Sequence, residues 1–340
     1  MTQHHNAPGV LVFAEQDDGK LADVSLELLA KARELAAKLN RSVAAALLGG
    51  NVAGLAARLI AHGADVVYLA EDPALGCYTT IPYAKVVCDI ITANRPEIVL
   101  FGASMAGRDL APRVASRMRT GLTADCTDLQ IGDFSDSKGS YTNLLYQIRP
   151  AFGGNIIATI ITPDHRPQMA TVREGVIPLK PADPSRTGEI RRVKVDLDEA
   201  DKAVSVIERL KADKKVNLKA ASVIVAGGAG VRSREGFDLI RELARTLGGE
   251  VGASRAAVDA GYIGKEHQVG QTGTTVRPKV YIACGISGQV QHRAGMDESG
   301  KIIAINTDPA APIFSIAHYG IVGDLFQVVP MLIDAYKQKT

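Results

Sequence analysis

Between Val10 and Met118, short apolar runs alternate with longer segments of helical periodicity. The apolar runs predict strands at Val10–Ala14, Val43–Leu48, Val66–Ala70 and Ile98–Gly102. The periodic segments predict helices at Leu21–Leu39, Val52–His62, Tyr83–Asn94 and Asp109–Met118. Runs that are apolar at every position are typical of parallel strands buried on both faces. This part of the chain is therefore predicted to be a parallel sheet with helices on both faces.

The pattern changes after Asp125. Strand-like segments follow one another without helices between them, at Leu129–Ile131, Tyr141–Ile148, Asn155–Ile161 and Met169–Arg173. We expect these segments to add antiparallel or mixed strands at the edge of the first sheet. The next segment, Pro178–Arg192, is rich in proline and charge, which predicts a surface loop.

A second alternating unit begins at Ser222. Strands are predicted at Ser222–Ala226, Val280–Cys284 and Ile302–Asn306, and Ser233 is placed to cap a helix that ends before Gly248. The lysine-rich connector around Leu210–Lys219 separates the two units. The predicted fold is α/β with two doubly wound domains. Residues 1–210 form the first, with its added edge strands, and residues 220–340 form the smaller second domain.

Composition excludes several classes of protein. The chain has 340 residues and a net charge of +2, which gives no reason to expect nucleic acid or an anionic membrane as a partner. No apolar run reaches the roughly 18–20 residues that span a bilayer, so no membrane insertion is expected. The N-terminus lacks the pattern of a secretory signal, and the four cysteines are widely separated. These features predict a cytoplasmic protein with reduced thiols and no bound metal.

Small polar residues gather after the predicted strands of the second domain. Glycine allows a close approach of backbone to ligand, and hydroxyl and amide groups supply uncharged donors and acceptors. Several such loops at one sheet edge predict a site for one large polar cofactor. The candidate binding residues are Ser254, Arg255, Val269, Gly270, Gln271, Thr272, Ser287, Gly288, Gln289, Val290, Gln291, His292, Asn306, Asp324 and Leu325. Taken alone, Arg255 is equally typical of a surface ion pair, and a lone His292 of a structural residue.

The turn Gly227–Gly230 (GGAG) stands between a strand and a helix, as in dinucleotide sites. It is an incomplete fingerprint, since Ser233 stands where the third glycine would be. We find no nucleophile–base pair, metalloprotease motif, P-loop or carboxylate pair, and so no catalytic residue is predicted. This favours a carrier in which a cofactor performs the chemistry and the protein binds and tunes it.

The same blocks, in the same order and spacing, resemble the alpha subunits of electron transfer flavoproteins from Ser222 to Pro330. The run Arg149–Gly154 (RPAFGG) is similar to the bacterial members in particular. The resemblance implies an FAD-binding second domain and a first domain that packs on an electron transfer flavoprotein beta subunit. It also implies electron transfer from a flavin dehydrogenase, such as an acyl-CoA dehydrogenase, to an acceptor.

The resemblance assigns roles to several candidates. It places Arg255 against the isoalloxazine ring, Thr272 near ring N5 and His292 near a pyrimidine oxygen. Asn306 and Asp324 would hold the ribityl and adenosine portions. Many relatives have an arginine where Ala229 stands, so this chain lacks one cation near the flavin.

Three alternatives remain at this point. The chain could be the alpha subunit of an electron-bifurcating flavoprotein, which uses NADH to reduce ferredoxin or flavodoxin and an acceptor such as an enoyl-CoA. It could be a stand-alone nicotinamide-dependent oxidoreductase with GGAG as its fingerprint. Such an enzyme needs an acidic ribose ligand after the second strand, and Glu250 would have to be taken for it although its position does not fit the role well. The chain could also be a regulatory nucleotide-binding module built on the first domain.

Overall fold

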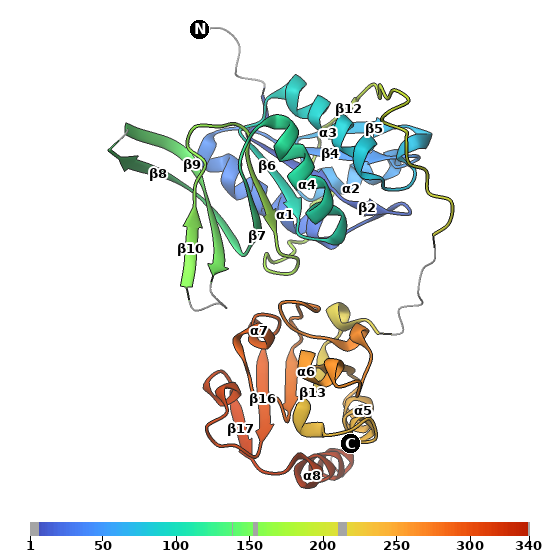
Figure 1. The fold of residues 1–340 in the computed structure, drawn as a ribbon, viewed down its shortest axis with the longest axis vertical. Helices are drawn as coiled ribbons and strands as arrows, with labels where there is room; N and C mark the ends of the chain where they lie inside the picture. Colours follow the sequence, from blue (N-terminus) through green and yellow to red (C-terminus); the bar gives the residue numbers. More distant parts are fainter. Residues whose placement is uncertain (1–6, 138, 152–155, 210–215, 339–340) are drawn as a thin grey trace. The chain divides into compact units, whose positions relative to one another are not determined.

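The computed structural model describes residues 7–137, 139–151, 156–209 and 216–338. The chain divides into two compact units, Met1–Arg209 and Leu210–Thr340, and each is described by itself (Figure 1). Most of the predicted connector, residues 210–215, lies outside the described residues.

The N-terminal unit is built on a sheet of seven parallel strands in the order β12-β5-β4-β1-β6-β11-β7. Its strands are β1 (Val10–Ala14), β4 (Val43–Gly49), β5 (Val66–Glu71), β6 (Ile98–Gly102), β7 (Leu122–Cys126), β11 (Gln168–Val172) and β12 (Glu189–Arg192). Its helices are α1 (Asp23–Leu39), α2 (Ala56–Ala61), α3 (Thr80–Asn94) and α4 (Met105–Met118). A short antiparallel hairpin follows β1, and its strands, β2 (Gln16–Asp17) and β3 (Lys20–Leu21), have two residues each.

The predicted two-sided burial is confirmed. Along β1, Val10 and Val12 pack with α1 and α2 on one face, and Leu11 and Phe13 pack with α3 and α4 on the other. Helix α4 begins four residues earlier than predicted, because the Ser104 hydroxyl accepts a hydrogen bond from the amide of Gly107 and caps it.

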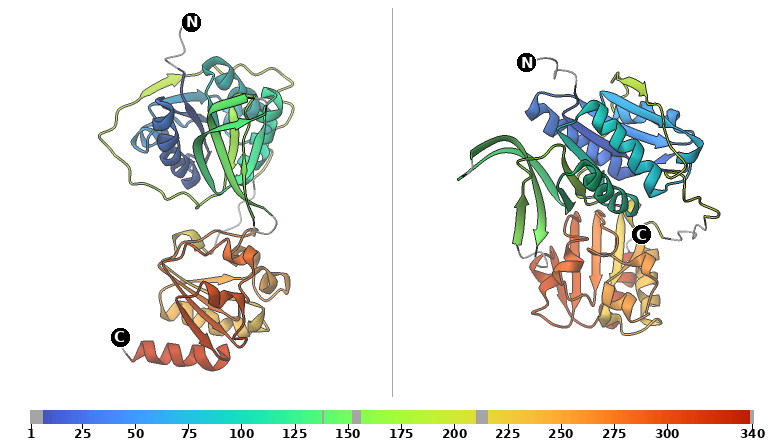
Figure 2. Two further views of the ribbon diagram at one scale, coloured as in Figure 1. Left: turned by 90° about the vertical axis from the view of Figure 1, so that its left-hand side faces the viewer. Right: turned by 45° about the horizontal axis from the view of Figure 1, so that its top comes forward.

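The expected edge strands are arranged differently from the prediction. A separate antiparallel sheet contains β8 (Asp128–Asp136), β9 (Gly139–Ala151) and β10 (Ile156–Ile160), seen as the curved ribbon of Figure 2. Strand β11, expected beside them, instead lies inside the parallel sheet between β6 and β7. The end of the predicted loop Pro178–Arg192 forms the edge strand β12 on β5. Local pattern could not reveal these pairings, since each joins segments distant in sequence.

The C-terminal unit has five parallel strands in the order β14-β13-β15-β16-β17. They are β13 (Val223–Gly227), β14 (Glu250–Ala253), β15 (Val280–Cys284), β16 (Lys301–Asn306) and β17 (Tyr319–Val322). The helices are α5 (Gly236–Thr246), α6 (Arg255–Asp259), α7 (Val290–Arg293) and α8 (Leu325–Lys337). Residues of α5, α6 and α8 pack on one face of this sheet. The other face is covered by loop residues such as Val269, Met296 and Ile313.

No helix within the described residues is long and apolar enough to cross a bilayer. All four cysteines are unpaired; Cys77 is exposed, and the other three are buried.

Candidate functional site

A cavity of about 750 Å³ opens at the carboxyl ends of the C-terminal strands. The chain passes from β13 to β14 on one side and later returns to β15 on the other, so the direction of winding reverses between β13 and β15. Ligands of open α/β sheets bind outside the carboxyl ends at such a reversal. The residues that follow β13, β14, β15 and β16 all contribute to the wall.

Ten of the fifteen candidate residues line this cavity. They are Ser254, Arg255, Val269, Gly270, Thr272, Ser287, Gln289, Gln291, His292 and Asn306. The fold thus brings to one cavity residues that lie up to 52 positions apart in the sequence, the distance from Ser254 to Asn306. Gln271, Gly288 and Val290 lie between lining residues along the chain without lining the cavity. Asp324 accepts a hydrogen bond from the amide of Phe326 and caps α8, while Leu325 is buried in the core.

The wall also contains residues that sequence reasoning did not select. These are Ala229, Gly230, Ala256, Asp259, Gln268, Gly285, Ile286, Asp308, Ala311 and Pro312. The position of Gly285, directly after β15, was the available signal, because residues after parallel strands meet at one edge. Ala229, which follows β13, also lies in the wall.

Glycine lets two loops of the site approach each other closely. Gly270 has a φ of 137°, and a Cβ there would lie 2.8 Å from the carbonyl oxygen of Gln291. The amide of Gln271 donates a 2.7 Å hydrogen bond to that same carbonyl. The block around Gly270 is therefore fastened to the block around His292, which keeps the polar side chains of both loops at one cavity.

Opposite charges lie together at one side of the cavity. The Arg255 Nε is 3.2 Å from an Asp259 carboxylate oxygen, one turn further along α6. Both side chains are mostly exposed, so the pair is held weakly, with a contribution of about 0–1 kcal/mol. The surface ion pair that sequence alone allowed is thus present. The guanidinium can also leave it at little cost to face a bound anionic or aromatic group.

A buried amide fixes the direction of one hydroxyl. Gln268 is 4% exposed, and its Nε2 donates a 2.9 Å hydrogen bond to the Thr272 Oγ1. Since the Thr272 oxygen already accepts this bond, its own hydrogen is available for an acceptor. The cavity wall thereby presents a hydroxyl donor at Thr272.

His292 supplies the clearest indication of a missing partner. The side chain is 7% exposed, and its Nε2 lies 2.9 Å from the Tyr281 hydroxyl. Its other nitrogen, Nδ1, is buried and makes no hydrogen bond of acceptable geometry among the described residues. A buried polar atom without a partner costs about 1–3 kcal/mol. In a residue that lines a cavity, such an atom fits a ligand that supplies the missing contact.

The protonation of His292 should make stability depend on pH. Burial lowers the pKa of His292 to about 4 from 6.5, against the nearby Val269 carbonyl, which raises it. Below pH 6.5 the unfolded chain binds a proton that the folded chain does not, so stability falls as the pH drops toward about 4. The lowered pKa corresponds to a loss of about 3 kcal/mol in the free energy of unfolding over this pH range. We expect His292→Gln to reduce the loss of stability of FAD-free protein between pH 7 and pH 4.5, measured by urea unfolding. An unchanged pH slope would contradict a buried neutral His292.

In the N-terminal sheet the winding reverses between β1 and β6, and among the described residues a carboxylate occupies this point. There Glu15, which follows β1, accepts a hydrogen bond from the hydroxyl of Ser104, which follows β6. A carboxylate at this point repels the phosphate of a nucleotide. This geometry disfavours a nucleotide-binding module built on the first domain.

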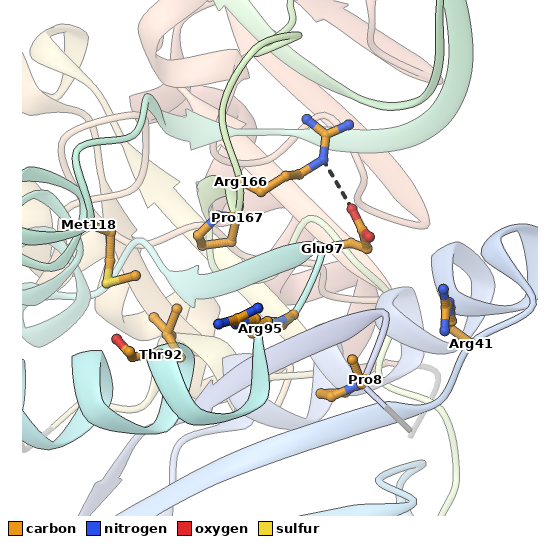
Figure 3. A pocket seen from close by; sticks show the side chains of 11 residues that line it. Pro8, Arg41, Thr92, Arg95, Glu97, Met118, Arg166 and Pro167 are labelled. Atoms are coloured by element: carbon orange, nitrogen blue, oxygen red, sulfur yellow. Dashed lines mark hydrogen bonds and ion pairs between the residues drawn. The ribbon is translucent and has the colours of Figure 1, made fainter. Parts of the chain in front are cut away.

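A second cavity, of about 500 Å³, lies at the opposite, amino edge of the N-terminal sheet (Figure 3). Pro8, Glu97 and Pro167 precede β1, β6 and β11 in its wall. The Arg166 Nε is already paired with Glu97 at 3.0 Å. This is not the edge at which parallel sheets hold nucleotides, so the C-terminal cavity remains the candidate cofactor site.

No described group of three or more His, Cys, Asp or Glu side chains is arranged to hold a metal ion. The polar groups of the C-terminal cavity instead suit an organic cofactor with many polar atoms: hydroxyls, amides, one guanidinium, a neutral imidazole and the carboxylates of Asp259 and Asp308.

Comparison with known proteins agrees with this site. Residues 10–198 match the electron transfer flavoprotein domain, and residues 217–297 match the electron transfer flavoprotein FAD-binding domain. The chain is 53% identical over 330 residues to the electron transfer flavoprotein subunit alpha of Thermoanaerobacterium thermosaccharolyticum, covering 97% of this chain and 98% of the relative. It is 52% identical over 334 residues to the same subunit of Megasphaera elsdenii, covering 97% of both.

A third relative has a different name. The chain is 43% identical over 325 residues to the lactate dehydrogenase (NAD(+),ferredoxin) subunit LctC of Acetobacterium woodii, covering 96% of this chain and 76% of the relative.

The protein is therefore a flavoprotein with a separate FAD-binding domain. The chain belongs to the electron transfer flavoprotein family, as an alpha subunit, and FAD is its cofactor. The predicted fold class, family and cofactor are confirmed.

Proposed function

We propose that the C-terminal cavity holds the FAD and that the ten predicted residues that line it provide most of the contacts. The orphaned Nδ1 of His292 carries this proposal, since it is a buried donor or acceptor on a cavity wall at the winding reversal. Thr272 would add a hydroxyl donor and Arg255 a mobile cation. When bound, FAD supplies the electron chemistry, and these side chains bind it, orient it and set its potential.

Within this proposal, the protein carries electrons between a flavin dehydrogenase, such as an acyl-CoA dehydrogenase, and an acceptor. It would act as a heterodimer with a beta subunit. The test is to co-express both subunits and to measure flavin absorption, FAD content and reduction by candidate dehydrogenases. Purified heterodimer without flavin absorption after FAD addition would refute the site. Heterodimer that binds FAD but accepts electrons from no flavin dehydrogenase would refute the donor class.

We further propose that the N-terminal domain packs on the beta subunit through its three-stranded sheet. Strand β10 exposes Ile156, Ile157 and Ile160, with Ile157 72% exposed. Neighbouring apolar side chains left open to water on a projecting sheet mark an interaction surface. The sheet carries a buried amide at Gln147 that lacks any hydrogen-bond partner among the described residues.

Ile157→Asp is expected to weaken the heterodimer at least tenfold, because the partner would bury a carboxylate in place of an apolar side chain. Titration of one subunit with the other, followed by analytical ultracentrifugation, measures the change. Ile207→Asp is the matched control, since Ile207 is 98% exposed outside that sheet and should leave assembly unchanged. Equal affinity of the Ile157→Asp variant and the unchanged chain would remove β10 from the interface.

Electron bifurcation is the second candidate. The observation that favours it is the 43% identity to a subunit whose name joins NAD(+) and ferredoxin. A second relative, 45% identical over 353 residues, is the acryloyl-CoA reductase electron transfer subunit beta of Anaerotignum propionicum. Two FAD per heterodimer, with NADH-dependent reduction of ferredoxin or flavodoxin, would establish bifurcation. One FAD with AMP would establish the simple carrier.

The nicotinamide-dependent alternative finds no support at the site. An acidic ribose ligand must follow the second strand, at the carboxyl edge. Glu250 is instead the first residue of β14, at the amino end, and does not line the cavity. Glu250 therefore cannot serve as the ribose ligand that this alternative requires.

A further inference from the structure

Behind the cavity wall, Tyr281 and His292 form a polar pair inside an apolar core. Tyr281 is on β15 and has no exposed surface, and its hydroxyl contacts the His292 Nε2 at 2.9 Å. Its neighbours in the core include Ile224, Ala283 and Ile302. Burying a hydroxyl in such surroundings costs free energy unless the hydroxyl is hydrogen-bonded, and the contact with His292 offsets this cost.

The hydrogen bond can run in only one direction if both groups are to be satisfied. A neutral imidazole carries one N–H and one accepting nitrogen. If His292 donated from Nε2, the hydroxyl hydrogen of Tyr281 would need a further acceptor, and among the described residues its hydroxyl contacts His292 alone. The hydroxyl therefore donates to Nε2, and the single ring proton resides on Nδ1.

The other surroundings of the ring agree with this direction. Burial lowers the pKa of His292 to about 4 and so keeps the ring neutral, with a single N–H. The two rings are tilted by 59° with centroids 6.1 Å apart, so the contact is through the polar atoms rather than by stacking. The Nδ1 atom of His292 is buried and has no hydrogen-bond partner in the part of the chain that the structure describes.

We infer that Tyr281 is a positioning residue, which holds His292 in the tautomer with its proton on Nδ1 and so aims one fixed donor at the cofactor. The contact between this donor and the cofactor rests on the proposed FAD site, whereas the tautomer of His292 does not depend on that proposal. A donor held in place before the ligand arrives favours negative charge on the ring atom that it meets, without the cost of reorienting the imidazole. Tyr281 itself does not line the cavity.

The first test uses FAD-free full-length chain labelled with ¹⁵N. Long-range ¹H–¹⁵N correlation spectra separate the two tautomers of His292, which is assigned by its disappearance in His292→Gln. We expect a protonated Nδ1 and an unprotonated Nε2 in the unchanged chain, and a mixture of tautomers in Tyr281→Phe. A protonated Nε2 in the unchanged chain would overturn the inference, whether or not FAD binds.

The second test uses the FAD-loaded heterodimer and a double-mutant cycle. Tyr281→Phe should weaken FAD binding about three- to tenfold, the scale of one lost hydrogen bond, and lower the flavin potential. In a His292→Gln background, the same change should have no further effect on affinity or potential, since Tyr281 acts through His292. Effects that add fully would overturn the positioning role.

Tyr319→Phe is the matched control. It removes the same atom from a tyrosine that is 61% exposed on β17, and it should alter neither the tautomer nor the potential. Tyr281→Phe keeps the ring in the core, and thermal unfolding of each variant establishes that the domain remains folded. If no variant and no unchanged heterodimer binds FAD, the site proposal fails while the tautomer result still stands.

Discussion

Gly285→Ala is expected to weaken FAD binding about tenfold or more, whereas Gly248→Ala should leave it intact. The two glycines share a φ of 64°, so the backbone strain from a Cβ, about 1–2 kcal/mol, is common to both variants. At Gly248 a Cβ would meet nothing within 4 Å. At Gly285 it would lie 2.9 Å from the Cα of Gly230 and from a methyl group of Leu325, at the cavity wall.

The difference between the two variants isolates the collision from the strain. Overpacking of this kind costs about 1–3 kcal/mol, which would lower affinity about tenfold or more if it is relieved by moving the cavity wall. Urea unfolding and FAD titration of both variants provide the measurement. Indistinguishable affinities would show that the turns after β13 and β15 do not need their close approach for binding.

Arg255→Ala is expected to lower the flavin reduction potential. A fixed cation near the ring favours the reduced, negatively charged form over the neutral oxidised form. Its removal should cost about 1–3 kcal/mol of differential stabilisation, the scale of a charge-assisted contact. The effect should be pronounced here, because Ala229 supplies no second cation at the wall. Redox titration of the FAD-loaded heterodimer measures the shift, after its FAD content has been checked.

Two further variants test the direction in which the flavin reduction potential changes. Asp259→Asn releases the guanidinium from its 3.2 Å partner, so the potential should rise. Arg255→Lys keeps the charge but loses the planar group, so the potential should change less than in Arg255→Ala. Equal potentials in all three variants would assign Arg255 to the surface pair alone.

The buried strands illustrate what local pattern can determine. The run Val10–Ala14 is apolar at every position, and only a strand covered on both faces satisfies such a run, so β1 was predicted with its bounds. The candidate residues after β15 and at the end of β16 follow strands that were predicted, and parallel strands direct their carboxyl ends to one edge. Strand β14 was not predicted, and Ser254 and Arg255, which follow it, were selected for their small polar and cationic groups and for the family resemblance.

The tertiary structure decided what depends on distant partners. Whether β11 lies inside the parallel sheet, and whether β8–β10 form a sheet of their own, is set by pairing between remote segments, which leaves no local signal. The same holds for the partners of polar side chains. Sequence marked Arg255, Thr272 and His292 as candidates. The fold paired them with Asp259, Gln268 and Tyr281, and these contacts determine which charge is mobile and which hydrogens are free. Composition and periodicity thus determined the architecture and the edge that holds the site, because they report burial. The direction of each donor was decided by packing, because a hydrogen bond needs a partner at a defined distance and angle.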